Sequence, residues 1–199
     1  FFLYAPMTQM QFPNLAHPDF MGATGLGDMA DSMVELDHRV GQLMEEVDKL
    51  GIRDNTLFIF ASDNGPEFRE PWRGTAGYWR GTYHTAMEGG LRAPAIMSWP
   101  KQIAEGRVSD EIIHVSDLYT TLAKIAGAEA SIPTDRAVDG VDQSVHIQED
   151  GSISITIGAM HRIFRNITCI HFANSAFGSL FGVCSPYQSS KIFNGVILF

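Results

Sequence analysis

The 199-residue sequence carries 14 lysines and arginines against 23 aspartates and glutamates, which gives a formal net charge of −9 at neutral pH. This acidic balance argues against nucleic acid or an anionic membrane surface as a partner, because both are negatively charged. The length suits one ordinary domain with a sizeable core, and no apolar run is long enough to span a bilayer. Two cysteines, Cys169 and Cys184, predict no disulfide framework and leave the redox compartment open.

The chain opens at Phe1 without an initiator methionine, within what reads as a strand, so we expect the beginning of a larger protein to precede it. Residues 1–5 (FFLYA) form a continuous apolar run, which is typical of a strand buried on both faces. The polar stretch 8–20 then predicts a loop at the carboxyl end of that strand.

A helix is predicted next, over residues 27–51, because apolar residues recur there at intervals of three and four. Its methionines, in the stretch 29–44, are interpreted as core residues rather than as a metal or partner site. Gly51 is expected as the C′ residue that ends this helix. Residues 56–61 (TLFIFA) predict the next strand.

The stretch 67–90 is rich in glycine, tryptophan and arginine and shows no clear period, so we interpret it as a long functional loop. A third strand is predicted over residues 93–100, ended by Pro100. A second helix follows over residues 116–127, with Ser116 as its N-cap. This order of elements predicts an α/β fold with a mostly parallel sheet flanked by helices.

The tail breaks this pattern, since no Asp or Glu occurs after Asp150. We therefore divide the chain into residues 1–148 and an atypical apolar tail over residues 149–199. One interpretation of the tail is a remnant of a small β-rich C-terminal subdomain. The other, slightly favoured, is a segment foreign to the ancestral protein, such as out-of-frame translation.

The string FASDNGPE (60–67) ends the second predicted strand with two oxygen-bearing side chains and two residues that favour turns. Asn-Gly favours a hairpin, but the residues that follow do not alternate, and Pro66 removes a ladder donor. The alternative is a ligand site at the carboxyl end of a strand. The oxygens of Asp63 and Asn64 suit Ca²⁺ or Mg²⁺, provided that Gly65-Pro66 bends the chain so that both side chains share one ion. Such a cation takes six to eight oxygens, so further ligands must come from elsewhere.

Several of these segments together resemble the type I sulfatases of the alkaline-phosphatase superfamily. The residues at 1–13 are similar to the sulfatase segment that contributes a sulfate-binding histidine, and the resemblance extends over about residues 1–148. It would make residues 1–148 part of a sulfatase catalytic domain whose N-terminal part is missing. The segments that carry the resemblance most specifically are TLFIFASDNGPE (56–67), MEGGLRAPAIMSWP (87–100), SDLYTTLAKIAG (116–127) and DGVDQ (139–143).

The resemblance implies hydrolysis of a small-molecule or carbohydrate sulfate ester to an alcohol and inorganic sulfate. It implies Asp63 and Asn64 as ligands of a divalent cation, usually Ca²⁺, with Mg²⁺ as the alternative. The remaining ligands are an aspartate pair, and the nucleophile is a formylglycine made from Cys or Ser in a C/S-x-P-S-R motif. Both are expected before Phe1, so no catalytic nucleophile is assigned within this chain, and we expect the isolated chain to be inactive. Many bacterial relatives are exported, but the sequence itself names no compartment.

Two positions depart from the family pattern. Gln11 stands where the resemblance implies a sulfate-binding histidine, and Tyr83 stands where it implies a sulfate-contacting lysine. A glutamine donates a hydrogen bond but cannot act as a proton donor near neutral pH. Loss of a charged contact at Tyr83 is expected to cost on the order of 2–4 kcal/mol of transition-state stabilisation. His84 could substitute if the loop shifts, although an exposed or structural histidine is the favoured interpretation. His17 is interpreted as a loop residue and Arg92 as a structural residue.

Two further features are interpreted as carrying no chemistry. Cys184-Ser185-Pro186 copies the start of the formylglycine motif, but it lacks the arginine and follows the Asp-Asn pair instead of preceding it. Trp72 and Trp79 are interpreted as packing anchors of the long loop rather than as a substrate platform. Two other functions stay open: a phosphodiesterase or phosphonate hydrolase of the same superfamily, and a non-catalytic remnant of a sulfatase.

Overall fold

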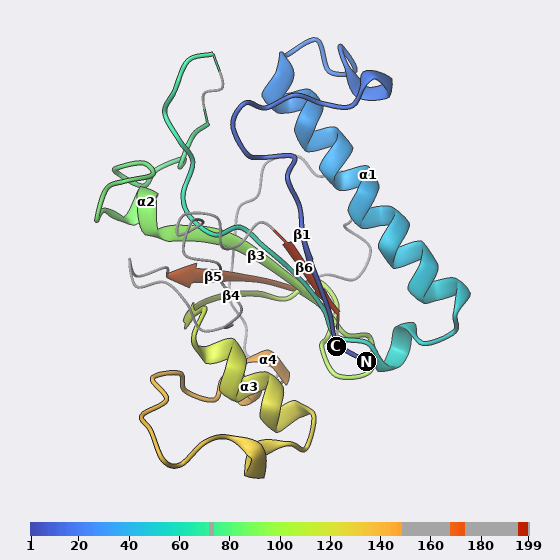
Figure 1. Cartoon of the computed structure of the whole chain (residues 1–199), viewed down its shortest axis with the longest axis vertical. Coiled ribbons are helices and arrows are strands. Elements are labelled where there is room, and N and C mark those ends of the chain that lie inside the picture. The colour runs from blue at the N-terminus through green and yellow to red at the C-terminus, as the bar shows by residue number, and fades with distance from the viewer. Residues whose placement is uncertain (72–73, 149–167, 174–194, 199) are drawn as a thin grey trace.

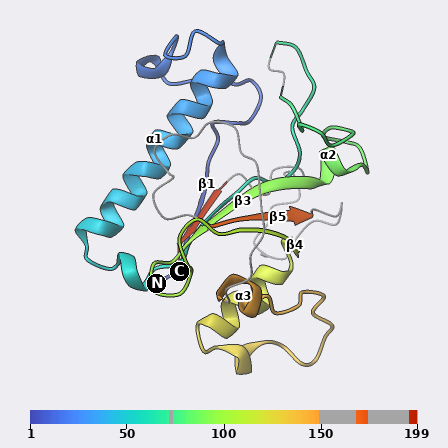
Figure 2. The same cartoon turned by 180° about the vertical axis from the view of Figure 1, so that it is seen from behind.

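The computed structural model describes residues 1–71, 74–148, 168–173 and 195–198. In this part of the chain, helices cover both faces of one six-stranded sheet (Figures 1 and 2). Trp72, Cys184, Ser185 and Pro186 lie outside the described residues. The elements in chain order are β1 (Leu3–Pro6), η1 (Pro18–Phe20), α1 (Asp28–Lys49), η2 (Arg53–Asn55), β2 (Phe58–Ala61), α2 (Glu88–Leu91), β3 (Arg92–Ser98), β4 (Val108–His114), α3 (Asp117–Ile125), η3 (Glu129–Ser131), α4 (Ser144–Gln148), β5 (Thr168–Ala173) and β6 (Gly195–Leu198).

The sheet has the strand order β1-β6-β2-β3-β5-β4, and most neighbouring strands run antiparallel. Of the described pairs, β4 with β5 is the parallel one. The expectation of a mostly parallel sheet is therefore wrong. Strand β3 lies beside β2 and runs antiparallel to it. Each of the two short tail strands lies between two strands of the main part: β6 between β1 and β2, and β5 between β3 and β4. Since β6 is antiparallel to both β1 and β2, those two strands point the same way.

Two apolar cores, one on each face of the sheet, explain the continuous apolar runs in the sequence. Leu57 and Ile59 face a cluster that includes Leu118 of α3 and Ile147 of α4. Alternate residues, Phe58 and Phe60 among them, pack on the other face against Leu36 and Val40 of α1. A strand covered on both faces needs apolar side chains at every position, and β2 is buried throughout.

Helix α1 confirms the predicted amphipathic segment to within two residues at each end. Leu50 is its C-cap, and Gly51 follows with φ of 68°, the left-handed conformation that glycine adopts easily. The apolar pattern did not predict that two acidic residues of this helix, Asp31 and Glu35, are also buried. Both carboxylates accept hydrogen bonds from the segment that precedes the helix.

Strand β1 is not buried on both faces as predicted. It is an edge strand, and the side chains of Phe1 and Phe2 are 73% and 51% exposed. An apolar run cannot distinguish an edge strand from a central one. Helix α3 is confirmed, but the Ser116 side chain does not cap it and lies instead 2.7 Å from Nδ1 of His114. Among the described residues, no helix is both long and apolar enough to cross a membrane.

Candidate functional site

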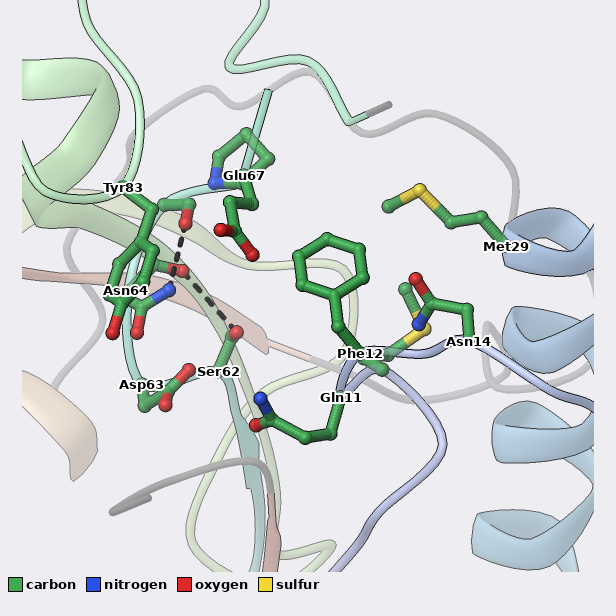
Figure 3. Close-up of a pocket in the computed structure, with 12 residues that line it drawn as sticks. Gln11, Phe12, Asn14, Met29, Ser62, Asp63, Asn64, Glu67 and Tyr83 are labelled. Atoms are coloured by element: carbon green, nitrogen blue, oxygen red, sulfur yellow. Dashed lines mark hydrogen bonds between the residues drawn. The ribbon is translucent and has the colours of Figure 1, made fainter. Parts of the chain in front are cut away.

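A cavity of about 110 Å³ lies where β2 ends, and Figure 3 shows its lining. Three segments far apart in the sequence meet there: the loop after β1, the turn after β2, and the long loop before α2. Four of the five predicted site residues belong to this lining. The lining residues are Met10, Gln11, Phe12, Asn14, Met29, Ser62, Asp63, Asn64, Gly65, Pro66, Glu67 and Tyr83.

The chain bends at Asp63 and Asn64, so that both residues line the same cavity. The bend is held by the Asn64 side-chain amide, which donates to the carbonyl oxygen of Gly65 at 2.8 Å, and by the Ser62 hydroxyl, which donates to the carbonyl oxygen of Asn64 at 3.4 Å (Figure 3). With its amide nitrogen so engaged, Asn64 offers its side-chain oxygen as the ligand atom. Two consecutive residues can therefore face one ion.

The Asn-Gly pair does not make the hairpin turn that the dipeptide favours. Neither Asn64 nor Gly65 has a positive φ, and β2 reaches β3 only through the long connection 62–91. Glycine is required at position 65 because of its surroundings. A Cβ there would lie 1.8 Å from the carbonyl oxygen of Gly89, and the Gly65 amide donates to the carbonyl oxygen of Gly90 at 3.0 Å. The turn is thus packed directly on the backbone of α2.

Tyr83 reaches the cavity because its loop is fastened to the same turn. Its backbone N–H donates to the carbonyl oxygen of Pro66 at 3.0 Å. A small turn closed by Thr85, whose hydroxyl donates to the carbonyl oxygen of Thr82 at 2.6 Å, holds the segment in place. His84 does not line the cavity; its ring packs on that of Tyr83 with 3.9 Å between centroids, and its φ is 66°.

Gln11 approaches from the loop after β1. Its backbone N–H donates to the carbonyl oxygen of Thr8 at 3.0 Å, which closes a turn beside Phe12. Figure 3 shows the amide end of Gln11 directed toward Asp63. This residue can therefore donate a hydrogen bond to a molecule held between the two segments.

The cavity contains a desolvated carboxylate. Burial raises the pKa of Asp63, and hydrogen bonds from backbone amides and from Ser62 only partly oppose this effect. Burial is also the main reason for the raised pKa of Tyr4, to which the charge of Asp63 adds. Removing a carboxylate from water disfavours its charged form unless a positive charge lies nearby.

Glu67 supplies a second carboxylate to the lining, and sequence analysis missed it. Figure 3 shows its carboxylate between Asn64 and Phe12. The residue is the last letter of FASDNGPE, so the signal was present, but it lies in an irregular loop, where no periodic pattern predicts the direction of a side chain. Asn14, almost fully buried, was missed for the same reason.

Three residues for which no role in the site was expected lie outside the cavity lining: Arg92, Trp79 and His17. The guanidinium of Arg92 lies over the ring of Trp79, 4.1 Å from its centroid, and pairs with Glu88. The backbone N–H of His17 donates to the carboxylate of Glu35 at 2.7 Å.

The donor set fits a hard divalent cation but does not complete its coordination. Asp63 and Glu67 offer carboxylate oxygens and Asn64 a carbonyl oxygen, the ligand types that Ca²⁺ and Mg²⁺ prefer. A partly buried carboxylate, in a lining without a basic side chain, is also what a bound cation would compensate. In the described part of the chain, no group of three or more His, Cys, Asp or Glu is arranged to hold a metal ion.

Comparison with known proteins gives one consistent family. The sulfatase family model matches residues 4–128. The chain is 42% identical to bovine arylsulfatase A over 145 residues, 72% of this chain and 28% of that protein. It is 35% identical to rat steryl-sulfatase over 148 residues, 71% of this chain and 25% of the relative. It is 37% identical to rat N-acetylgalactosamine-6-sulfatase over 144 residues, 71% of this chain and 27% of the relative.

The chain thus spans about a quarter of the length of these relatives. The matched part contains the strand β2, the turn that carries Asp63 and Asn64, and the loop that carries Tyr83. The family model covers well over half of the sequence. This chain belongs to the sulfatase family.

Proposed function

We propose that this chain supplies the cation-binding and oxyanion-facing part of a site that hydrolyses sulfate esters to an alcohol and inorganic sulfate. The observation that carries the proposal is the joint position of Asp63, Asn64, Gln11 and Tyr83 around one cavity, within the sulfatase-matched part of the chain. The ester belongs to the class of small-molecule or carbohydrate sulfates.

Asp63 and Asn64 are the proposed cation ligands, with Ca²⁺ as the first choice and Mg²⁺ as the alternative. A divalent cation bound there would supply positive charge beside the sulfuryl oxygens, where charge accumulates as the ester bond breaks. The remaining ligands and a formylglycine nucleophile are assigned to residues outside this chain. The isolated chain is therefore expected to bind the cation without turning over the ester.

Gln11 and Tyr83 are the proposed contacts to the sulfate oxygens. Each offers a neutral donor, the side-chain amide N–H of Gln11 and the phenol O–H of Tyr83. Neither matches the strength of a charged donor, so we expect them to orient the sulfate while adding little transition-state stabilisation. His84 is left out, because its ring packs on Tyr83 and does not line the cavity.

The test is a chimaera in which residues 4–128 replace the matching segment of bovine arylsulfatase A. We expect the folded chimaera to release sulfate from an aryl sulfate ester, and we expect Asp63→Ala to abolish this release. Asp54→Ala is the matched control, because the Asp54 side chain is 65% exposed and pairs with Lys101 at the surface. Gln11→His and Tyr83→Lys should each raise the rate, by up to about 10²-fold if a charged donor is restored.

The same chimaera separates the alternatives. Hydrolysis of a phosphate diester or a phosphonate, with no action on the sulfate ester, would assign the segment to the neighbouring enzyme class. A folded chimaera that hydrolyses none of these esters, even with Gln11→His and Tyr83→Lys, would mark the segment as a non-catalytic remnant. Circular dichroism and the melting temperature establish that the chimaera is folded.

A further inference from the structure

Helix α1 buries a carboxylate that lies outside the cavity lining. Glu35 is 6% exposed, and its neighbour Leu36 packs against the sheet. Burial opposes ionisation of this carboxyl group, but hydrogen bonds from His17, Gln9 and Arg39 lower its pKa below its usual value. A buried charge is costly unless it is paired and hydrogen-bonded, so the identity of these partners shows what the carboxylate holds in place.

The partners of Glu35 include the two ends of one loop. One carboxylate oxygen accepts a hydrogen bond from Nε2 of Gln9 at 3.4 Å, and the other accepts one from the backbone N–H of His17 at 2.7 Å. Arg39, one turn further along α1, places its Nε 3.5 Å from the oxygen that faces Gln9. A single side chain of the helix thus holds residues 9–17 at both ends.

Between these two anchors, the loop is closed on itself and faces the cavity. The side-chain amide of Asn14 donates to the carbonyl oxygen of Gln9 at 3.2 Å, and the backbone N–H of Gln11 donates to that of Thr8 at 3.0 Å. Gln11, Phe12 and Asn14 lie between the anchors and line the cavity (Figure 3). Their position relative to the turn after β2 therefore depends on where α1 holds the loop.

A second buried carboxylate of α1 provides a comparison. Asp31, one turn before Glu35, is 4% exposed and accepts hydrogen bonds from the backbone N–H groups of Gly22 and Thr24. Neither of these two residues belongs to the cavity lining. The two carboxylates have similar surroundings, but of the two it is Glu35 that holds a loop of the site.

We propose that Glu35 is a positioning residue, which holds both ends of residues 9–17 and so fixes Gln11 beside the turn that carries Asp63. Leu36 packs against Phe60 of β2, the strand that leads into this turn, so one helix aligns both segments. The inference rests on the proposed function for the role of Gln11. It adds to the site a residue that lies outside the cavity and does not contact the substrate.

The first experiment is hydrogen–deuterium exchange, followed by mass spectrometry, on the full 199-residue chain. Glu35→Gln keeps the size of the side chain, but it removes the charge and sets an amide donor against the donor of Gln9. We expect the amides of residues 8–17 to exchange roughly tenfold faster, because hydrogen bonds to a charged acceptor are lost. Exchange in β2 should stay unchanged.

Two further variants make this measurement specific. Glu35→Gln combined with Gln9→Glu restores a donor and an acceptor with their places exchanged, and it should recover much of the lost protection. Asp31→Asn is the matched control, because it alters a carboxylate that is equally buried on the same helix. It should speed exchange around residues 22–24 and leave residues 8–17 protected.

The second experiment uses the chimaera with bovine arylsulfatase A and measures hydrolysis of an aryl sulfate ester. We expect Glu35→Gln to raise KM severalfold with a smaller change in kcat, as for loss of a binding contact. In a Gln11→Ala background the same substitution should have little further effect on KM, because the positioned group is gone. Asp31→Asn should leave KM unchanged in both backgrounds. A role in stability alone would not couple Glu35 to Gln11.

The outcomes separate this inference from the proposed function. A folded Glu35→Gln chain with unchanged exchange in residues 8–17 overturns the inference. So does a rise in KM that is equally large with and without the Gln11 side chain. A folded chimaera that hydrolyses no ester overturns the proposed function, and the exchange rates then decide whether Glu35 holds the loop.

Discussion

The backbone N–H of Tyr83 donates to the carbonyl oxygen of Pro66 at 3.0 Å, and this bond joins the long loop to the turn that carries Asp63 and Asn64. Beneath it, the backbones of Gly65, Gly89 and Gly90 pack against one another without side chains. Added Cβ atoms at Gly89 and Gly90 would lie 2.3 and 2.4 Å from carbonyl oxygens of the loop. The geometry of the site thus depends on close backbone contacts.

Gly65→Ala is predicted to destabilise the chain and to displace the site. The new Cβ would lie 1.8 Å from the carbonyl oxygen of Gly89, so the turn or α2 must move. We expect a loss of about 1–3 kcal/mol in the free energy of unfolding, as for other overpacked positions, measured by urea denaturation. Gly41→Ala in α1 is the control, since its Cβ meets nothing within 4 Å and should stabilise the helix by up to about 1 kcal/mol. Equal stabilities of the two variants would contradict the prediction.

Calcium is predicted to raise the melting temperature of the chain, because a ligand that binds only the native state stabilises it. At a calcium concentration a hundred times Kd, the gain is about 2.7 kcal/mol. Asp63→Asn should reduce the calcium-induced shift strongly, because it removes a charged ligand. Asp54→Asn removes the same charge from a largely exposed side chain and should leave the shift intact. Differential scanning calorimetry with calcium or with EDTA measures the shift in melting temperature. An undiminished shift in Asp63→Asn would exclude this residue as a ligand.

The apolar runs predicted where strands form, but neither their direction nor, for residues 1–5, their burial. In the two central strands, β2 is buried at every position and β3 is buried over residues 95–98, although Pro94 is exposed. The same pattern suits a parallel or an antiparallel neighbour, so it could not predict that β3 runs antiparallel to β2. For FFLYA it could not reveal an edge position, because the number of neighbouring strands is set by distant parts of the chain.

The candidate site was predictable where a short motif fixes the local chemistry. Asp63 and Asn64 do line one cavity, and the glycine-proline pair does accompany a bend. The reason for Gly65 was not predictable, since it lies in a contact with Gly89, some twenty residues further along the chain. Glu67 was missed because its orientation depends on the fold of the loop around it.

Stability is predicted to fall in acid partly through Asp31. Hydrogen bonds from the Thr24 hydroxyl, the Thr24 amide and the Gly22 amide lower the pKa of Asp31 below its usual 3.8. A depressed folded-state pKa gives stability that is present above the unfolded-state pKa and is lost as pH falls through the folded-state value. Asp31→Asn should therefore flatten the dependence of unfolding free energy on pH below about pH 4. Urea titrations between pH 6 and pH 3 measure this slope.

Asp28→Asn is the control for that experiment, because Asp28 lies in the same first turn of α1 and its side chain is exposed. We expect this variant to keep the acid dependence of the wild type. If Asp31→Asn and the wild type lose stability in parallel as pH falls, the loop over residues 22–24 does not draw its stability from this carboxylate.

Asp117→Ala is predicted to be strongly destabilising, because this buried carboxylate joins three segments of the fold. It accepts hydrogen bonds from the backbone N–H groups of His114 at 2.8 Å and Val141 at 2.9 Å, so it connects the end of β4 to the segment before α4. The variant leaves two donors without their acceptor, and each donor that stays buried and unpaired costs about 1–3 kcal/mol. Asp139→Ala, an exposed residue of the same connected segment, should change the unfolding free energy by less than about 0.5 kcal/mol. Denaturant titration of the two variants gives the comparison, and similar losses in both would mean that the Asp117 contacts add no stability beyond that of a surface carboxylate.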